Sequence, residues 1–369
     1  MSSSGLLISY ILKLFVVCLN KLTVIDQAIK QISDIEELLK KPIKLKVAHC
    51  SLLNFQDRSI LMKLSIVLCT YNNAESLRLT LNDIASCVLD DAAQIEVIVV
   101  NNNATDHTQQ VYEDVKGLFS CPVHHTVESN QGLSHARNLG LSAATGEYVL
   151  FTDDDAIIPT TWIQAYLQHI ERSSPACLYS KIRVHWEKTI PDWYIPEYQA
   201  FFVHLNYGDE KQNIIDIHHE FFGKNFCVRR DILNEYGGFD PKLGRSGDKL
   251  IAGEETLIYL RLIAENRKVL YFPEAEVGHR LKEREYTLEN IKKLFSDSSY
   301  SAYHIPKMTS GKKLFGRPLY PLKSNLLGIP GNLVHLFKNF FWGNENRARY
   351  FRFRLSRNFK VLGLWWTNP

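Results

Sequence analysis

The sequence lacks paired cysteines and has few cysteines of any kind. Its 369 residues include seven, an odd number at scattered positions, and no two of them form a C-x-x-C pair. This pattern argues against a disulfide framework and a structural zinc site, which need cysteines at matched spacings. The thiols are therefore expected to be reduced, which predicts a cytoplasmic setting. Internal repeats and low-complexity segments are missing as well.

Long hydrophobic runs are also missing. The apolar stretch from Leu6 to Leu19 is short and is interrupted by Lys13, whereas a spanning helix needs roughly 20 apolar residues. No convincing small-residue cleavage site follows it, which argues against a secretory signal peptide. Residues 1–61 are interpreted as an N-terminal extension, or as residues upstream of a true start at Met62, which precedes the first strand-like segment.

Acidic residues are scarce at the C-terminal end. From Pro306 onward there are twelve Lys and Arg residues against one Glu, although the whole chain has a net charge of only +3. We therefore expect residues 306–369 to form a basic, aromatic extension that differs from the rest of the chain. The length leaves room for one large α/β domain in addition to such extensions.

Two short, almost wholly apolar segments, Leu64–Thr70 and Ile95–Val100, are rich in β-branched residues. This composition is typical of parallel strands that are buried on both faces. Each segment ends in polar turn residues and is followed by a helical pattern of apolar residues. The repeated order of strand, loop and helix predicts an α/β fold with a mixed, mostly parallel sheet. Ligands of such sheets bind beyond the carboxyl ends of the strands, where loops 70–75, 101–106 and 152–155 would meet.

A third apolar segment, Tyr148–Thr152, runs directly into three carboxylates, Asp153, Asp154 and Asp155. Adjacent like charges repel, so a folded chain keeps them together readily only where water or a cation compensates their charge. Oxygen-rich groups of this kind suit Mg²⁺ or Mn²⁺, which also bind phosphates. One interpretation is therefore a metal site for a phosphorylated ligand. The other is a solvated acidic loop in which an aspartate caps the next helix.

Six motifs resemble those of family 2 glycosyltransferases of the GT-A fold, of the kind that builds bacterial polysaccharides. They extend over roughly residues 62 to 285 and read SIVLCTYNN, VIVVNNNATD, NQGLSHARNLGL, GEYVLFTDDDAIIP, GKNFCVRRDI and GEETLIYLRL. A single piece is a weak signal, but six in register are strong together. The resemblance implies a Rossmann-like nucleotide-sugar-binding domain at 62–305, with a nucleotide-binding half (62–160) and an acceptor half (161–305).

In that family, carboxylates at the position of the triplet hold a metal ion and touch the ribose. The resemblance therefore implies Asp153 and Asp155 as metal ligands, and Asp153 and Asp154 as donor-binding residues. A divalent cation acts as a Lewis acid toward a leaving diphosphate, so Mn²⁺ or Mg²⁺ is the expected cofactor. Relatives often carry a histidine near the metal at the position of His279. That side chain is either a third ligand or a structural residue.

A helical pattern opens at Gly253 with two glutamates, Glu254 and Glu255. An acceptor hydroxyl is a poor nucleophile unless a carboxylate removes its proton. Glu255 occupies the position of the family's catalytic base, and Glu254 is expected beside the acceptor. The alternative is that both acids merely complement the dipole at the start of a helix.

The resemblance also implies contacts with the nucleotide. Thr70 and Tyr71 are expected against the base, Arg137 at the base or the diphosphate, and position 101 at the uracil edge. Asn72 is a further expected nucleotide-sugar-binding residue. The family commonly has Asp at position 101, whereas this chain has Asn101. An amide can still accept a hydrogen bond from a ring N–H, but it carries no charge. A UDP-sugar is the expected donor; alternatively, the consecutive asparagines of this loop are ordinary turn residues.

Residue type and resemblance together suggest where the acceptor binds. Residues 186–223 are dense in aromatics and prolines, which indicates a long irregular insertion. Flat aromatic faces suit a sugar, so Trp186, Trp193 and Tyr194 are candidate acceptor residues, with plain packing as the alternative. Gly223 and Asn225 are expected near the acceptor by resemblance.

Apolar residues recur at helical spacing in the C-terminal extension, just after Pro330-Gly331, at Leu333, Leu336, Phe337, Phe340 and Phe341. An Arg-rich segment and two tryptophans follow. This composition favours an element in an anionic membrane interface, where lipid-linked acceptors would be close. The alternative is a helix that packs back on the domain with its charges solvated. No nucleic-acid motif accompanies the basic charge, so nucleic acid is not an expected partner.

These observations predict a metal-dependent, inverting glycosyltransferase of polysaccharide biosynthesis that moves a sugar from a nucleotide-sugar to a saccharide or lipid-linked acceptor. It would be cytoplasmic, with peripheral contact at the inner face of the plasma membrane. Two alternatives stay open. A sugar-1-phosphate nucleotidyltransferase should have a glycine-rich loop after the first strand, which residues 70–75 lack. A non-catalytic nucleotide-sugar- or membrane-binding module would have no need of Glu255.

Overall fold

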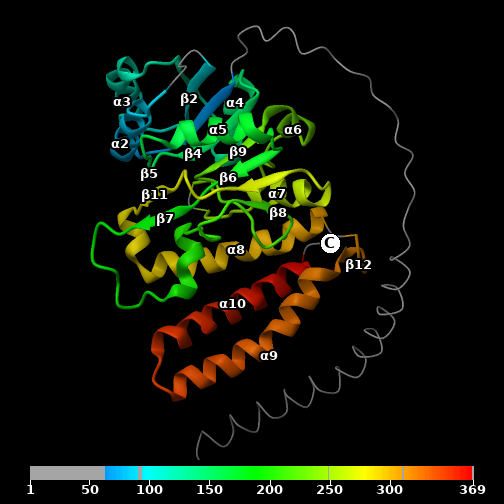
Figure 1. Cartoon of the computed structure of the whole chain (residues 1–369). Coiled ribbons are helices and arrows are strands. Elements are labelled where there is room, and N and C mark those ends of the chain that lie inside the picture. The colour runs from blue at the N-terminus through cyan, green and yellow to red at the C-terminus, as the bar shows by residue number, and fades with distance from the viewer. Residues whose placement is uncertain (1–62, 90–93, 248, 310, 368–369) are drawn as a thin grey trace, which may run out of the picture. The chain divides into compact units, whose positions relative to one another are not determined.

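The computed structural model of the chain describes residues 63–89, 94–247, 249–309 and 311–367. The chain divides into two units, 1–58 and 59–369, and all described residues belong to the second. The predicted N-terminal extension, 1–61, lies outside the described residues. Figure 1 labels the helices and strands that the described residues form.

Eight strands form the central sheet, in the order β3-β2-β1-β4-β9-β6-β10-β8. The first four in this order are parallel, whereas β9 is antiparallel to both of its neighbours. Beyond β9, β6 and β10 are parallel and β8 is antiparallel. The prediction of a mixed, mostly parallel α/β sheet is confirmed. The strands are β1 (Leu64–Thr70), β2 (Ile95–Asn101), β3 (Val123–Val127), β4 (Tyr148–Asp153), β6 (Cys177–Tyr179), β8 (Gln212–Ile214), β9 (Phe226–Arg229) and β10 (Val269–Tyr271).

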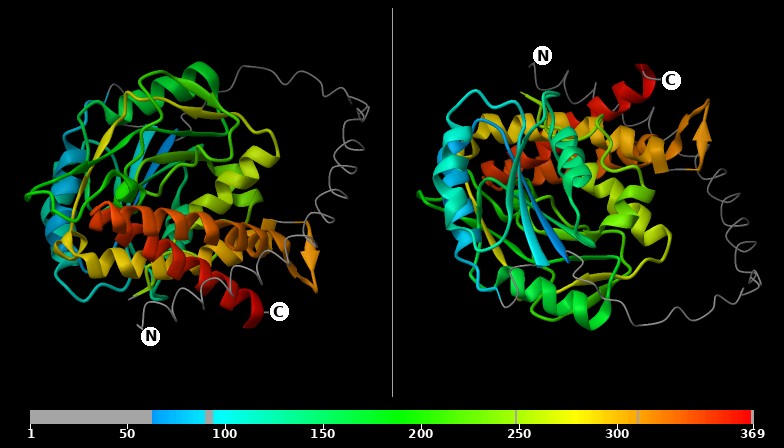
Figure 2. Two further views of the ribbon diagram at one scale, coloured as in Figure 1. Left: turned by 90° about the horizontal axis from the view of Figure 1, so that it is seen from below. Right: turned by 90° about the horizontal axis from the view of Figure 1, so that it is seen from above.

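Helices lie on both sides of this sheet, as Figure 2 shows. They account for the burial of every residue of β1 and β2, which is why those segments are mostly apolar. The helices of this part of the chain are α2 (Ala74–Ala85), α3 (Thr108–Val115), η2 (Lys116–Leu118), α4 (Leu133–Ala143), α5 (Trp162–Ser173), η3 (Pro196–Phe202), α6 (Arg230–Glu235), α7 (Glu254–Ala264) and η4 (Glu283–Tyr286).

A second, three-stranded sheet positions the residues that follow the acidic triplet. Its order is β5-β11-β7, formed by β5 (Ala156–Ile157), β11 (Val277–Arg280) and β7 (Ile182–His185). β5 begins directly after the triplet, and the backbone N–H of Arg280 donates to the carbonyl of Asp155 at 2.8 Å. This pairing brings residues 279–282 next to the triplet, although they are distant in sequence.

Three long helices follow, α8 (Leu288–Thr309), α9 (Leu319–Phe341) and α10 (Glu345–Thr367), with the short strands β12 (Lys313–Leu314) and β13 (Arg317–Pro318) between the first two. α10 packs against both α8 and α9, so α9 is the outermost (Figure 1). The predicted boundary between residues 305 and 306 falls inside α8. The helix predicted to begin after Pro330-Gly331 begins earlier, at Leu319, and Pro330 lies within it.

The side chains between the layers are apolar, and the cysteines contribute to them. The five cysteines among the described residues are free and buried, in agreement with the expectation of reduced thiols: Cys69, Cys87, Cys121, Cys177 and Cys227. Of the helices that the described ranges form, none is both long enough and apolar enough to cross a bilayer.

Candidate active site

A pocket of about 470 Å³ opens at the carboxyl ends of β1 and β4. This volume is within the range of small-molecule sites. Loops 70–75 and 152–155 both contribute to its wall, as predicted, whereas loop 101–106 contributes only Asn102. The start of α7 forms another part of the wall, so residues from both predicted halves of the domain meet here.

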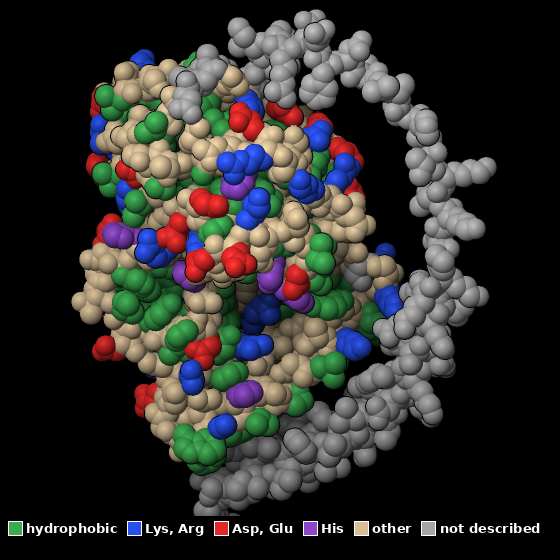
Figure 3. Space-filling model, viewed as in Figure 1, with side chains coloured by type: hydrophobic (Ala, Val, Ile, Leu, Met, Phe, Trp, Pro, Cys, Tyr) green, Lys and Arg blue, Asp and Glu red, His purple; other side chains and the backbone are tan. Residues whose placement is uncertain are grey.

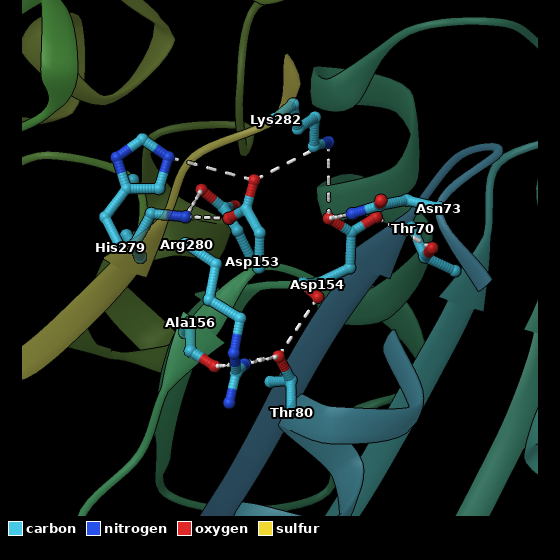
Figure 4. A network of polar contacts seen from close by, with 12 residues as sticks. Thr70, Asn73, Thr80, Asp153, Asp154, Ala156, His279, Arg280 and Lys282 are labelled. Atoms are coloured by element: carbon cyan, nitrogen blue, oxygen red, sulfur yellow. Dashed lines mark hydrogen bonds and ion pairs between the residues drawn. The ribbon is translucent and has the colours of Figure 1, made fainter. Parts of the chain in front are cut away.

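Asp154 is held by the loop that follows β1. Thr70 Oγ1 donates to Asp154 Oδ2 at 2.8 Å, and Asn73 Nδ2 donates to Oδ1 at 2.6 Å (Figure 4). The register of β1 on β4 places Cys69 opposite Asp153 and so brings these side chains together. Burial, above all, raises the pKa of the Asp154 carboxyl. The hydrogen bond therefore fixes the side chains of Asp154 and Thr70, and both face the pocket.

Two lysines compensate the charge of the other two aspartates. Lys224 Nζ forms an ion pair with Asp155 Oδ1 and lies 3.5 Å from Asp153 Oδ2. Lys282 Nζ lies 3.5 Å from Asp155 Oδ2 and 3.6 Å from Asp154 Oδ1 (Figure 4). Burial alone would raise the pKa of Asp155, but the two ammonium groups outweigh it, and that pKa lies well below its usual value. The triplet is thus ionised at Asp155 and closely paired.

His279 of β11 lies against the triplet, as the resemblance implied. Its Nδ1 is 2.8 Å from the carbonyl oxygen of Phe202, so Nδ1 must carry the proton. Burial, foremost, lowers the pKa of His279, and the ring is neutral. The Nε2 lone pair then faces Asp155 Oδ2 at 3.8 Å and Glu285 Oε2 at 3.9 Å. Electron-rich atoms that face each other in this way mark a position suited to a cation.

Arg137 of α4 is buried and joins the triplet to α7. Its Nη1 donates to Glu254 Oε1 at 2.6 Å, and its Nη2 lies 3.5 Å from Asp153 Oδ1. Nη2 also donates to the carbonyl of Gly223 at 3.3 Å. A Cβ at Gly223 would lie 2.1 Å from Nη2, so only glycine permits this approach. Arg137 also lines the pocket, so its contact with a nucleotide stays a prediction.

The two glutamates of α7 have different surroundings. Gly253, with φ of 110°, starts the helix in a backbone conformation that favours glycine. Glu254 is 2% exposed and paired with Arg137. Burial, and then the neighbouring Glu255 carboxylate, raise the pKa of Glu254 to about 8. Glu255 is only partly buried, lines the pocket and has an Oε2 atom without a protein partner.

Only some of the predicted nucleotide-binding residues line the pocket. Tyr71 and Asn72 line it, and Tyr71 is 41% exposed. Asn72, with φ of 47°, accepts a hydrogen bond from the backbone N–H of Thr105. Asn101 does not reach the wall, because its Oδ1 accepts from the backbone N–H of Ala104 at 2.7 Å. The structure therefore gives Asn101 the turn-forming role that was the alternative interpretation.

Asn225 does not face the pocket, which corrects its predicted acceptor role. It is 1% exposed, and its Nδ2 donates to the carbonyls of Lys181 and Ala275. Its Oδ1 accepts from Trp162 Nε1 and from Tyr166 Oη. Every polar atom of this side chain is used inside the fold. Asn225 ties β9 to α5 and leaves nothing to offer a sugar.

The candidate aromatic residues Trp186, Trp193 and Tyr194 also lie away from the pocket wall. They pack in a cluster around Phe202, at ring-centroid distances of 5.2 Å for Trp186 and 6.3 Å for Trp193. The structure thus favours the packing alternative for these aromatics. Gly223 and Glu254, by contrast, do line the pocket.

The lysines at the triplet were not predicted. Lys224 stands inside the GKNFCVRRDI motif and Lys282 three residues after His279. The triplet itself indicates that positive charge must lie nearby, because three adjacent acids need compensation. A buried lysine can supply that charge as well as a metal ion can. Glu220 and Arg245, which also line the pocket, carried no comparable signal.

The carboxylates and the imidazole of the site fit a hard divalent cation in kind. Their arrangement is that of ion pairs with lysine, however. Over the ranges that the structure describes, no three His, Cys, Asp or Glu side chains are grouped to hold a metal ion. Asp153, which is the most accessible acid of the triplet with 26% of its side chain exposed, is the one that a ligand from the pocket would meet first.

Comparison with known proteins gives the family. Residues 65–237 match the family model described as Glycosyl transferase family 2. The glucosyl-dolichyl phosphate glucuronosyltransferase of Haloferax volcanii is 26% identical over 234 residues, an alignment that covers 60% of this chain and 70% of that protein.

Solved structures agree on the fold. Staphylococcus aureus TarS in complex with UDP-GlcNAc gives a TM-score of 0.50 at 18% identity, covering 69% of this chain and 68% of that one. The mannosyltransferase PcManGT of Pyrobaculum calidifontis, in complex with GDP-Man and Mn²⁺, gives 0.51 at 15% identity, covering 89% and 92%. At such identities the likeness concerns the fold alone, which is GT-A. Together with the family match, it identifies the chain as a glycosyltransferase whose residues 65–237 match glycosyl transferase family 2.

Proposed function

We propose that this glycosyltransferase moves a sugar from a nucleotide-sugar to an acceptor hydroxyl with inversion at the anomeric carbon. The observation that carries the proposal is that one pocket holds both the acidic triplet and the glutamates of α7. The acceptor oxygen forms its bond to the anomeric carbon as the bond from that carbon to the diphosphate oxygen breaks. The diphosphate leaves with the bonding electrons, and the acceptor proton goes to a carboxylate.

Glu255 is the carboxylate that takes the proton. It lines the pocket and has an oxygen without a protein partner, whereas Glu254 is committed to Arg137. A general base needs a free lone pair within reach of the hydroxyl. Both glutamates have an Oε2 without a hydrogen-bond partner, but Glu254 is 2% exposed and paired with Arg137, whereas Glu255 is only partly buried. The role of Glu254 is then to position Arg137, and through it Gly223 and Asp153, rather than to contact the acceptor.

The donor lies along the wall that Thr70, Tyr71 and Asn72 form. The exposed ring of Tyr71 offers a flat face for a base. Arg245, Lys282 and Arg284 line the same pocket and supply positive charge for a diphosphate. We propose a UDP-sugar, in line with the UDP-GlcNAc complex of TarS. The GDP-Man complex of PcManGT makes a guanine nucleotide the alternative.

The site suits Mn²⁺ or Mg²⁺ by the chemistry of its donors, and the PcManGT complex contains Mn²⁺. Asp153 and Asp155 would hold the ion, with the neutral Nε2 of His279 as the nitrogen donor. Such an ion would take up charge that develops on the leaving diphosphate. The protein's own part is to keep Asp154 fixed through Thr70 and to keep the His279 lone pair turned toward the triplet.

The experiment that tests this function is a screen of UDP-, GDP- and dTDP-sugars for release of the nucleoside diphosphate, with Mn²⁺ and with EDTA. We expect slow release of the nucleoside diphosphate from one donor, because water can attack in place of the acceptor hydroxyl. Release should become faster when a saccharide acceptor is added. Binding of a nucleotide-sugar without any release, with or without acceptors, would instead support the non-catalytic module. The nucleotidyltransferase alternative is excluded by the family match.

We also propose that the enzyme contacts an anionic membrane through α9. The outer face of this helix is apolar although solvent-exposed. At its end, Phe340 is 65%, Phe341 80% and Trp342 73% exposed. Figure 3 shows hydrophobic side chains at the surface at the lower end of the view, where the α9–α10 turn lies. Further exposed apolar residues of α9 are Tyr320, Leu326, Leu327, Leu333, Val334 and Phe337.

Three asparagines are buried where α9 and α10 pack together, although apolar residues are usual at such a helix interface. Asn332 Nδ2 donates to Asn358 Oδ1 at 3.0 Å, and Asn358 Nδ2 donates to Asn325 Oδ1 at 3.1 Å. All three amides are buried. Because α9 keeps its asparagines inside and its phenylalanines in solvent, burial of its outer face against an apolar partner would be favourable.

Positive charge selects an anionic lipid surface as that partner. Lys323 and Lys338 of α9 are exposed, as are Arg352, Arg354 and Lys360 of α10. Lys338 Nζ lies 5.2 Å from the ring centroid of Trp342, so cation and aromatic ring meet at the tip. Apolar and basic groups side by side are what an anionic interface binds. A lipid-linked acceptor, as in the name of the Haloferax relative, would be delivered at such a surface at the inner face of the plasma membrane.

A further inference from the structure

Each aspartate of the triplet has a lysine ammonium within ion-pairing distance. Lys224 reaches Asp153 and Asp155, and Lys282 reaches Asp154 and Asp155. Three carboxylates in sequence would otherwise repel one another strongly in a buried place. Two lysines of the protein therefore compensate the negative charge of the triplet.

Lys224 is the more deeply buried of the two lysines. Its side chain is 1% exposed and does not line the pocket, whereas that of Lys282 is 29% exposed and does. Lys224 lies just before β9, which pairs antiparallel with β4, the strand that carries the start of the triplet. An ammonium at this depth persists only with carboxylate partners, and the triplet provides them. Lysine and triplet are thus mutually dependent parts of the fold.

We propose that Lys224 is the resident counter-ion of the triplet, so that the free enzyme does not bind a divalent cation there and takes one up only together with a nucleotide diphosphate. The inference rests on the proposed donor site. Without nucleotide, the favourable positions around Asp153 and Asp155 are already held by an ammonium group. A diphosphate adds anionic oxygens to the same place, and these provide partners for a further cation.

The test is a titration of the full-length protein with Mn²⁺, in which the electron paramagnetic resonance signal reports free Mn²⁺. For the wild type we expect no saturable binding without nucleotide and one bound Mn²⁺ in the presence of UDP or GDP. Lys224→Met keeps the length of the side chain but removes its charge. It should bind Mn²⁺ without nucleotide at least about tenfold more tightly than the wild type, because Asp153 and Asp155 have each lost one compensating charge.

Thermal melting gives a second readout. Lys224→Met should melt at a lower temperature than the wild type in EDTA and regain stability in Mn²⁺, whereas the wild type should melt alike in both. Lys224→Arg keeps the charge and should behave as the wild type. Lys181→Met is the matched control, because Lys181 is also buried but pairs with Asp209 away from the triplet. Asp155→Asn added to Lys224→Met should abolish the rescue by Mn²⁺.

Tight binding of one Mn²⁺ to the wild type without nucleotide, equal to that of Lys224→Met, would overturn the proposal. So would a Lys224→Met protein that Mn²⁺ fails to restore. If Lys224→Met gains Mn²⁺ while no nucleotide promotes binding to the wild type, the counter-ion role stands and the proposed donor site fails. The two conclusions can therefore be separated.

Discussion

At the scale of single residues, Glu254 and Glu255 give the sharpest test of the mechanism. We expect Glu255→Gln to lower kcat by about 10²–10⁴ with little change in donor affinity, because the amide keeps the size of the side chain but cannot accept a proton. Steady-state kinetics measure kcat, and calorimetric titration measures donor binding.

Glu254→Gln is the neighbouring control and should cost far less in kcat, since Glu254 contacts Arg137 and not the reacting atoms. If Glu254 proves essential and Glu255 dispensable, the assignment of the base is off by one residue. If both variants retain wild-type turnover, the base lies elsewhere in the pocket, and the mechanism proposed above fails.

The buried Glu254 also makes stability depend on pH. Its pKa is about 8 in the folded protein against an ordinary value of 4.5. Between these values the folded state holds a proton that the unfolded chain has released. The stability due to this group is complete below pH 4.5 and is lost as pH rises through about 8. We expect the wild type to lose on the order of a few kcal/mol of unfolding free energy relative to Glu254→Gln between about pH 5 and pH 9.

Urea denaturation of both proteins at a series of pH values measures this difference. The amide of Gln does not titrate, so the variant reports every other pH-dependent group and serves as the baseline. Parallel stability curves for the two proteins would mean that Glu254 is ionised in the folded state throughout this range, held so by Arg137.

At the scale of elements, the α9–α10 hairpin can be tested without disturbing the fold. Phe340→Ser, Phe341→Ser and Trp342→Ser together should abolish flotation with phosphatidylglycerol vesicles, because these exposed side chains supply the apolar contact. The melting temperature should hardly change. Added salt should weaken the binding of the wild type, since the basic residues act through screened charge.

A matched control replaces three exposed apolar residues elsewhere, Leu118, Val127 and Ile215, with serine. This protein should float as the wild type does. Equal flotation of all three proteins would refute a membrane role for the tip. Substitution is preferable to truncation here, because α10 buries Val361 and Trp365 against Tyr303 of α8 and its removal would open the core.

At the scale of the whole molecule, β1 at Leu64 is the first element that the described residues form. We expect a protein that contains only residues 62–369 to melt cooperatively and to retain turnover. Differential scanning calorimetry and the donor-release assay measure the two properties. Loss of the cooperative transition would show that residues 1–61 belong to the core of the domain.

Much of the fold was open to prediction because its signal is local. β1 and β2 are predicted as strands because they are mostly apolar and β-branched, and every residue in them is buried. The triplet predicted a charged site at the end of β4 for a similar reason. The antiparallel entry of β9 between β4 and β6 was not predictable, because strand pairing over long sequence separations leaves no local pattern.

The site was predictable only in part, for reasons that differ between residues. Motif register identified Asp153 and Glu255, and the structure brings both to the pocket. The sequence does not single out Lys224, because a metal ion is an equally good partner for three acids. The motif around Asn225 indicates that the residue matters but not which way its side chain points. In the same way, the apolar spacing predicts a helix that begins just after Pro330-Gly331, whereas α9 continues through Pro330.

The interlocked asparagines of the hairpin have a consequence for which acceptors the enzyme can use. A slip of α9 by one turn would separate Asn325 and Asn332 from Asn358, so the two helices have one permitted register. α9 has 23 residues and is therefore roughly 34 Å long. α10 is fastened to the pocket wall through Arg357 Nε, which donates to Ser298 Oγ at 3.0 Å. With the outer face of α9 on lipid, this rigid hairpin would hold the active site at a set distance from the bilayer and so select acceptors whose terminal sugar reaches that distance.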